Sequence, residues 1–197
     1  MSDSDDVIND SGVGIPDRLQ RIWNPHRMSY IASEITETAE VTAQGAAPAK
    51  GSSHPFLDIP KMSDEEGLIV ARGEHVYAVL NLYPYNPGHA MVVPYRQVSE
   101  LEELTPAESA ELMAFTQRLI RAIKSVSNPD AFNVGINLGA AAGGSLADHL
   151  HQHIVPRWTG DANYITVIAG TKVVPQLLRD TRRLLAEAWD KVGGAPA

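Results

Sequence analysis

The sequence predicts an α+β fold built around an antiparallel sheet. Segments of strand type follow one another with links of hairpin length, and one long amphipathic segment interrupts them. Strands joined by short turns pair antiparallel, because parallel neighbours need a crossover of a dozen or more residues. Together these observations favour one sheet with helices packed beside it.

Length and composition are those of an ordinary globular protein. The chain has 197 residues, of which 44% are hydrophobic and 20% charged, enough for one domain with a sizeable core and extensions. It contains no cysteine, which excludes disulfides and thiolate metal sites. No apolar run approaches the ~20 residues that span a bilayer, and the acidic N-terminus does not resemble a secretory signal. We therefore expect a cytoplasmic protein that does not enter a membrane.

Acidic residues are concentrated in the N-terminal third. Residues 1–66 hold 12 acids and 5 bases, whereas residues 67–197 hold 12 acids and 11 bases. The second part can therefore host a locally positive pocket despite the net charge of −8. The sequence lacks the dense basic face of a nucleic-acid binder, so we expect no nucleic-acid partner.

Three regions follow from the local composition. Residues 1–17 are polar and aperiodic, which predicts a disordered acidic tail. Residues 18–64 form an N-terminal extension that starts with apolar anchors and continues into "AQGAAPAKGSSHP", a linker-like stretch. Residues 65–197 show strand alternation and helical periodicity, which predicts the folded domain with its C-terminal helix.

The predicted sheet takes its strands from this domain. Apolar and β-branched runs bounded by turn residues mark them. The approximate strands are 68–72, 75–82, 89–95, 131–139 and 149–156. Gly73–Glu74 joins the first two, and the turn "NPGH" precedes the third.

A helix over 106–126 is the clearest single element. Thr105, Pro106 and Glu108 form a capping box with proline at the first helical position. Apolar residues at helical spacing are expected to face the core, namely Leu112, Phe115, Leu119 and Ile123. A second amphipathic helix is predicted within 173–192.

The stretch "DHLHQHIVPRW" places His149, His151 and His153 at alternate positions. In a strand such side chains share one face at ~6.5–7 Å per step, so the outer two lie ~13 Å apart. All three cannot close on one zinc ion, which holds nitrogen ligands at ~2.0–2.1 Å. Two of them with a further ligand still can, and a solvated or core-edge histidine face is a second alternative. The third is nucleotidyl transfer through a covalent histidine, because neutral imidazole is a nucleophile near pH 7.

Several segments together resemble the histidine triad (HIT) superfamily of nucleotide hydrolases and transferases. His149 to Val155 is similar to its signature of histidines alternating with apolar residues, and Gln152 departs from it but should face the other side of the sheet. "NLYPYNPGHAMVVP" (81–94) and "NLGAAAGGSLADH" (137–149) resemble two further segments. "WNPHRMSYI" and "GDANYITVI" are similar to a longer bacterial branch that includes actinobacterial diadenosine tetraphosphate phosphorylases.

The resemblance implies a role for each matching residue. His151 would be the nucleophile, His149 would orient it, and His153 would contact the α-phosphate. The implied nucleotide- and phosphate-binding residues are Asn81, His89, Asn137, Gly144, Ser145, Arg157 and Trp158. The asparagines can instead bond their own backbone in turns, Gly144 and Ser145 can belong to an ordinary loop, and the last two can be surface or packing residues.

The resemblance also implies the HIT fold, a five-stranded antiparallel sheet with one long central helix and a C-terminal helix, in a homodimer or homotetramer. The implied reaction cleaves a dinucleoside polyphosphate, as in diadenosine tetraphosphate plus phosphate to ATP plus ADP. A hydrolase that uses water, a metal-dependent enzyme and a non-catalytic nucleotide-binding module are the alternatives. We expect no protein-bound metal and no tightly bound cofactor beyond Mg²⁺ carried by the nucleotide.

Overall fold

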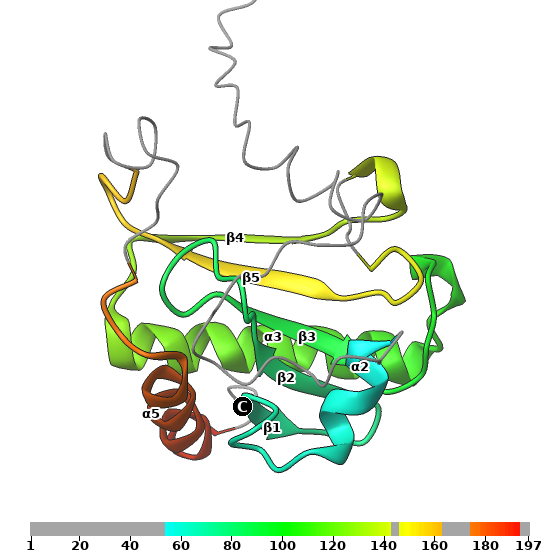
Figure 1. Ribbon diagram of the computed structural model, residues 1–197, viewed down its shortest axis with the longest axis horizontal. Helices are drawn as coiled ribbons and strands as arrows, with labels where there is room; N and C mark the ends of the chain where they lie inside the picture. Colours follow the sequence, from blue (N-terminus) through cyan, green and yellow to red (C-terminus); the bar gives the residue numbers. More distant parts are fainter. Residues whose placement is uncertain (1–53, 143–145, 163–173, 194–197) are drawn as a thin grey trace, which may run out of the picture. The chain divides into compact units, whose positions relative to one another are not determined.

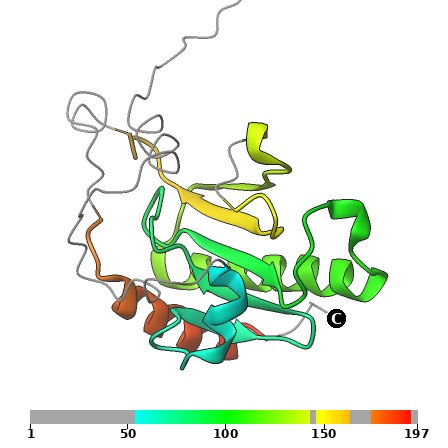
Figure 2. The same cartoon turned by 45° about the vertical axis from the view of Figure 1, so that its right-hand side comes forward.

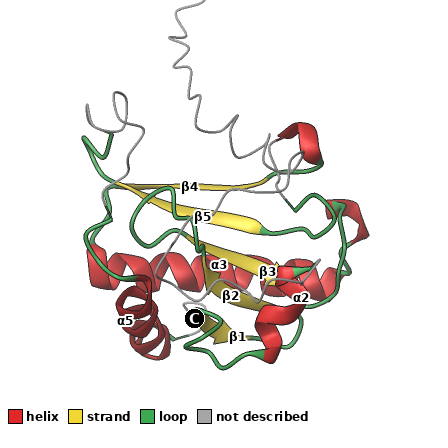
Figure 3. Ribbon diagram, in the orientation of Figure 1, coloured by secondary structure: helices red, strands yellow, loops and turns green. Residues whose placement is uncertain are grey.

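The computed structural model describes residues 54–142, 146–162 and 174–193, which form one sheet flanked by helices (Figures 1 and 3). The strands are β1 (Ile69–Arg72), β2 (Val76–Leu80), β3 (Ala90–Pro94), β4 (Ala131–Ile136) and β5 (Gln152–Arg157). The helices are α2 (Pro55–Asp58), α3 (Pro106–Ser127) and α5 (Leu178–Lys191). The short 3-10 turns are η1 (Ile59–Lys61), η2 (Leu101–Glu103) and η3 (Ala140–Ala142).

The five strands pair in the order β1-β2-β3-β5-β4, and every pair is antiparallel. This confirms the α+β fold that the sequence predicts. The last strand inserts between β3 and β4, so His153 has a cross-strand partner on each side, Met91 and Gly135. The central position of β5 fixes the backbone of the histidine segment from both sides.

Alternate residues of the central strands supply two apolar layers. β2 and β3 are buried along their whole length. On one face Ala78, Val92 and Ile154 belong to a core cluster that also contains side chains of α3 and α5. On the other face Tyr77 and Met91 pack with Phe56 of α2. Figure 2 shows α2 (cyan) in front of the sheet and α3 behind it.

Helix α3 begins with the predicted capping box. The Thr105 amide donates to the Glu108 carboxylate at 2.8 Å, and the Glu108 amide donates to Thr105 Oγ1 at 3.2 Å. Arg96 donates two hydrogen bonds to the same carboxylate, from Nε at 2.8 Å and from Nη2 at 2.7 Å. The helix therefore starts where its sequence signals indicate, and a cation from the segment after β3 holds that start.

Several boundaries differ from the approximate ones that the sequence predicts, and β4 ends at Ile136 rather than 139. The last strand begins at Gln152 rather than 149, and residues 55–61, which the sequence assigns to an extension before residue 65, are helical with Phe56 buried in the core. The linker-like composition before them does not reveal this packing. The predicted tail at 1–17 and most of the extension lie outside the described residues. Within the described ranges, no helix is long and apolar enough to cross a membrane.

Glu108→Gln should make the domain less stable at neutral pH but not in acid. The Arg96 guanidinium and the Thr105 amide lower the Glu108 pKa from 4.5 to about 2. Since the folded pKa is depressed, this stabilisation is present above pH 4.5 and is lost as pH falls toward about 2. We expect urea unfolding to report a loss of about 1–2 kcal/mol at pH 7, shrinking to nothing near pH 2. An equal loss at both pH values would contradict this.

Candidate active site

The three alternate histidines lie on one side of the sheet, but only His153 is within β5. His149 and His151 precede the strand, because the backbone there bonds elsewhere: the Leu150 amide donates to the carbonyl of Val98 at 2.6 Å. The expectation of one continuous strand through all three is therefore wrong. The rings of His151 and His153 nevertheless meet edge to face, with centroids 4.8 Å apart.

One hydrogen bond determines which nitrogen of His151 is reactive. Its Nδ1 donates to the backbone carbonyl of His149 at 2.8 Å. A carbonyl oxygen can only accept, so the single proton of a neutral ring sits on Nδ1 and the lone pair on Nε2. Burial lowers the His151 pKa below its ordinary value of 6.5. The geometry therefore provides a neutral imidazole with a free nucleophilic nitrogen.

His149 orients the central ring through its backbone and not through its side chain. Its Nε2 donates to the carbonyl of Pro94, at the end of β3, at 2.9 Å. Its Nδ1 is buried and has no hydrogen-bond partner among the described residues. The side chain fixes the path of the chain, so the carbonyl of the same residue meets His151 Nδ1.

His89 is a fourth imidazole in this cluster, and it determines the proton position on His153. The Tyr85 amide donates to His89 Nδ1 at 3.0 Å, which places the proton of His89 on Nε2. That nitrogen lies 2.9 Å from Nδ1 of His153 and donates to it. The proton of neutral His153 must then sit on Nε2, where it can be offered to an anion.

Burial keeps these two rings neutral. It is the main cause that lowers the pKa of His89 to about 3 and that of His153 to about 4. The neighbouring His151 acts in the same direction on both, because a second positive charge nearby is unfavourable. Proton donation by His153 is therefore that of a neutral N–H over the physiological pH range.

Two aromatic rings that the sequence analysis did not assign to the site pack against these imidazoles. The Phe56 ring centroid lies 4.9 Å from that of His151 and 5.5 Å from that of His149. Tyr85 stacks on His153 at 5.8 Å. Phe56 follows a stretch of linker composition, so nothing local marks it, whereas Tyr85 stands within the segment that carries His89.

The Gln152 side chain points to the opposite side of the sheet, as the sequence predicts. It is buried, and its Nε2 donates to Oγ1 of Thr116 on α3 at 2.6 Å. The polar departure from the apolar pattern is thus satisfied by a polar partner on the helix. It does not disturb the histidines.

The asparagines predicted to contact nucleotide flank the same strands. Asn81 Oδ1 accepts from the Tyr83 amide at 2.9 Å, and its Nδ2 lies 3.4 Å from His89 Nδ1. It is therefore both a turn asparagine and a neighbour of the histidine cluster. Asn137 follows Ile136, the residue of β4 that pairs with Gln152. Gly144 and Ser145 lie outside the described residues.

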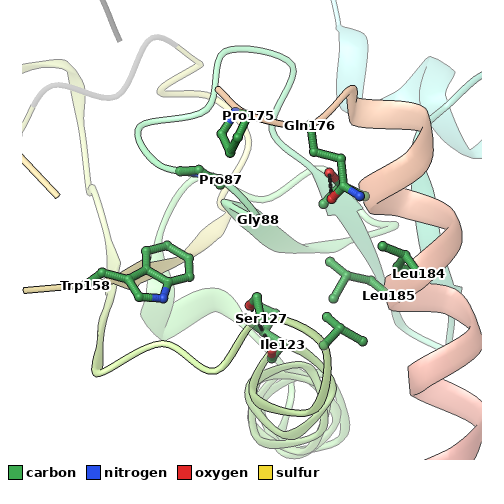
Figure 4. A pocket seen from close by; sticks show the side chains of 11 residues that line it. Pro87, Gly88, Ile123, Ser127, Trp158, Pro175, Gln176, Leu184 and Leu185 are labelled. Atoms are coloured by element: carbon green, nitrogen blue, oxygen red, sulfur yellow. Dashed lines mark hydrogen bonds between the residues drawn. The ribbon is translucent and has the colours of Figure 1, made fainter. Parts of the chain in front are cut away.

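Arg157 and Trp158 are placed away from the histidine cluster. Arg157 forms an ion pair with Asp161 at 2.6 Å and donates to Asn133 Oδ1 at 2.7 Å. Trp158 lines a separate pocket of about 290 Å³ on the helix side, bounded by Ile123 and Leu185 of α3 and α5 (Figure 4). The described part of one chain does not bring these two side chains together with the triad.

Metal ligands are not grouped in the described ranges. No cluster of three or more histidine, aspartate or glutamate side chains there could hold a metal ion. The short His89–His153 contact is accounted for by an N–H···N hydrogen bond between neutral rings.

Known proteins are similar to this chain in sequence. The HIT domain model matches residues 63–160, and a Mycobacterium tuberculosis protein named AP-4-A phosphorylase is 65% identical over 185 residues, 94% of this chain and 92% of the relative. The chain belongs to the HIT family. A Schizosaccharomyces pombe protein named asymmetrical bis(5'-nucleosyl)-tetraphosphatase is 39% identical over 84 residues, which are 43% of this chain and 46% of that protein.

The solved structure of a hypothetical histidine triad nucleotide-binding protein from Sulfolobus tokodaii has the same fold. It superposes with a TM-score of 0.57 at 26% identity, over 69% of this chain and 91% of that protein. The HIT fold expected from the sequence resemblance is thereby confirmed, including its sheet and long helix.

Phe56→Ala should raise the pKa of His151. The wild-type ring should titrate below 6.5, because burial disfavours its charged form, and removing the Phe56 ring admits water to it. The pH dependence of the imidazole Cε1–H signals in NMR spectra measures this directly. Phe115→Ala, which removes a ring from the helix side of the sheet, is the control and should leave His151 unchanged. A His151 pKa that is the same with and without Phe56 would reject this role.

Proposed function

We propose that this HIT protein cleaves dinucleoside polyphosphates by nucleotidyl transfer through His151, and that its preferred reaction converts diadenosine tetraphosphate and orthophosphate to ATP and ADP. The observation that carries the chemistry is the His151 Nδ1 bond to a carbonyl, which leaves Nε2 free to attack. The choice of substrate is supported by the relative named AP-4-A phosphorylase, at 65% identity over 94% of the chain.

The proposed reaction has two in-line displacements at one phosphorus. His151 Nε2 attacks the α-phosphorus, the bond to the bridging oxygen breaks, and ATP leaves. An oxygen of orthophosphate then attacks the same phosphorus, the nitrogen–phosphorus bond breaks, and ADP is formed. His153 offers its Nε2 proton to a non-bridging oxygen, where negative charge is concentrated in both steps.

Ligand contacts around this centre follow the sequence resemblance. Asn81 is proposed for the ribose, and Asn137, Gly144 and Ser145 for the phosphates. Arg157 and Trp158, which lie away from the triad of their own chain, are proposed as outer contacts. Mg²⁺, where it takes part, enters with the nucleotide, and no other cofactor is proposed. A cytoplasmic location stays a prediction of the sequence.

Water as acceptor is the second candidate. The His151 geometry serves either acceptor, since the second displacement only requires an oxygen nucleophile on the open side of the phosphorus. The Schizosaccharomyces pombe relative, named as a tetraphosphatase, favours this alternative over the 84 residues that it shares with the chain. The much more extensive match to the phosphorylase supports orthophosphate.

Labelled orthophosphate distinguishes the two acceptors. Incubated with diadenosine tetraphosphate, the wild-type protein should place the label in ADP, and His151→Ala should lose at least ~10³-fold in rate. His54→Ala, a substitution of a histidine outside the triad, is the matched control. If the products are unlabelled ADP or AMP, the reaction is hydrolysis and not phosphorolysis. If His151→Ala turns over substrate at the wild-type rate, His151 is not the nucleophile.

A homodimer that pairs through β4 is proposed as the minimal assembly. β4 is an edge strand whose outer side pairs with no strand among the described residues. It is exposed along much of its length, and Val134 is 46% exposed. Exposed apolar edge strands readily pair with another chain. The predicted tetramer would require additional contacts from residues 18–60, most of which are outside the described ranges.

Val134→Lys should convert the dimer to monomers, because a charge on the apolar edge strand opposes pairing with its own copy. Light scattering on a sizing column at micromolar concentration gives the mass. Met113→Lys, a matched change at a residue of α3 that is 51% exposed, should leave the mass unchanged. A wild-type protein that is already monomeric would contradict the proposed assembly.

A further inference from the structure

The turn that carries His89 is closed by its own backbone. His89 donates its amide to the carbonyl of Asn86 at 3.0 Å across Pro87 and Gly88. Proline at the second position and glycine with φ +76° at the third are those of a type II turn. The position of Asn86 therefore determines where the His89 imidazole lies.

Asn86 is attached to the far end of β5. It is 2% exposed, and its Nδ2 donates to the carbonyl of Pro156 at 2.9 Å and to Asp161 Oδ2 at 2.6 Å. Pro156 belongs to β5, the strand that also carries His153. One strand thus supplies both the histidine and the anchor of the turn that faces it.

Asp161 accepts hydrogen bonds from several groups. Its carboxylate accepts from Arg157 Nε at 2.6 Å and Nη2 at 3.0 Å, and from the Trp158 amide at 3.2 Å, besides the amide of Asn86. The Arg157 guanidinium holds the Asp161 pKa well below its usual range, so the carboxylate stays ionised. An ionised acceptor gives Asn86 a stronger bond than a neutral one would.

These contacts form a closed series that begins and ends on β5. Asp161 and Pro156 hold Asn86, Asn86 holds the turn, the turn places His89, and His89 Nε2 donates to His153 Nδ1 at 2.9 Å. We propose that Asp161 and Asn86, together called the latch, are positioning residues that fix the proton of His153 on Nε2, through His89. The benefit to catalysis rests on the proposed function, because it assumes that this proton meets a phosphate oxygen.

The other groups near His89 and His153 do not replace this control. His151 packs edge to face with His153 and lowers the pKa of His89, but it directs its own proton to the carbonyl of His149. Tyr85 stacks on His153 and packs at a tilt against His89, and of its groups only the backbone amide bonds to His89. If the turn shifts, His89 Nε2 leaves His153 Nδ1, and that ring is free to hold its proton on either nitrogen.

The experiment compares Asn86→Ala, Asp161→Ala and their double variant in the full-length chain. Long-range ¹H–¹⁵N NMR spectra report which nitrogen of each histidine carries the proton, without substrate. Steady-state kinetics with diadenosine tetraphosphate give kcat and KM separately. Asp64→Ala is the matched control, because Asp64 likewise accepts from an arginine Nε, that of Arg72 at 2.7 Å, but at the β1 edge of the sheet.

We expect each latch variant to show a mixture of His153 tautomers and a kcat lowered at least about tenfold, with KM changed much less. The double variant should be no worse than the more affected single one, because both residues act through one turn. Asp64→Ala should retain the wild-type tautomer and kcat. If Asp161→Ala fails to fold, Asn86→Ala, which keeps the Arg157 ion pair, is sufficient.

Two results would overturn the inference. One is a His153 proton that stays on Nε2 in Asn86→Ala with kcat at the wild-type value. The other is an Asp64→Ala variant that loses as much kcat as the latch variants, which would make the effect one of general stability. If the protein turns over no dinucleoside polyphosphate, the proposed function is wrong. The tautomer spectra, which are recorded without substrate, then still test whether Asn86 and Asp161 fix the proton of His153.

Discussion

A neutral imidazole has one ring proton, and the site depends on where four buried or half-buried histidines hold theirs. Each ring can donate from one nitrogen and accept at the other, so a single fixed partner determines both. The carbonyl of His149 does this for His151, and the Tyr85 amide does it for His89 and, through it, for His153. Burial maintains the arrangement, because adding a second proton to any of these rings would place a charge in a poorly solvated layer.

The fold supplies these partners from backbone at the ends of its strands and in the connections between them. The carbonyl that receives His149 belongs to the last residue of β3, and the amide that orders His89 lies in the connection between β2 and β3. Inside a sheet the backbone amides and carbonyls are hydrogen-bonded to the neighbouring strands, whereas at strand ends they are available to side chains. The site therefore sits where β5 enters the sheet, between two neighbours that fix its path. Phe56 and Tyr85 then exclude water from the rings that the backbone has oriented.

Local signals predicted much of this molecule because they act over a few residues. The capping box at Thr105 and Glu108 depends on contacts three residues apart, and it forms as expected. Continuous apolar runs bounded by turn residues mark β2 and β3, which are buried on both faces. The start of β5 was misplaced, since His149 and Leu150 bond to the segment around Pro94 and Val98, which no local pattern encodes. Phe56 was missed for the same reason: Tyr77, which donates to its carbonyl, and the two histidines that its ring contacts are 21 or more residues away.

The sequence by itself determined the residue types and their spacing: three imidazoles at alternate positions, a fourth after Pro-Gly, and the strands and helix around them. Tertiary structure decided which nitrogen of each ring bears the proton. The His149 carbonyl and the Tyr85 amide are close in sequence to the rings that they orient, but long-range contacts of their segments bring them there. It also decided that Arg157 and Asp161, four residues apart, anchor the His89 turn through Asn86, 75 residues away from Asp161 along the chain. Spacing can bring imidazoles to one face of a sheet, but a proton's position depends on whichever group the folded chain brings within about 3 Å of each nitrogen.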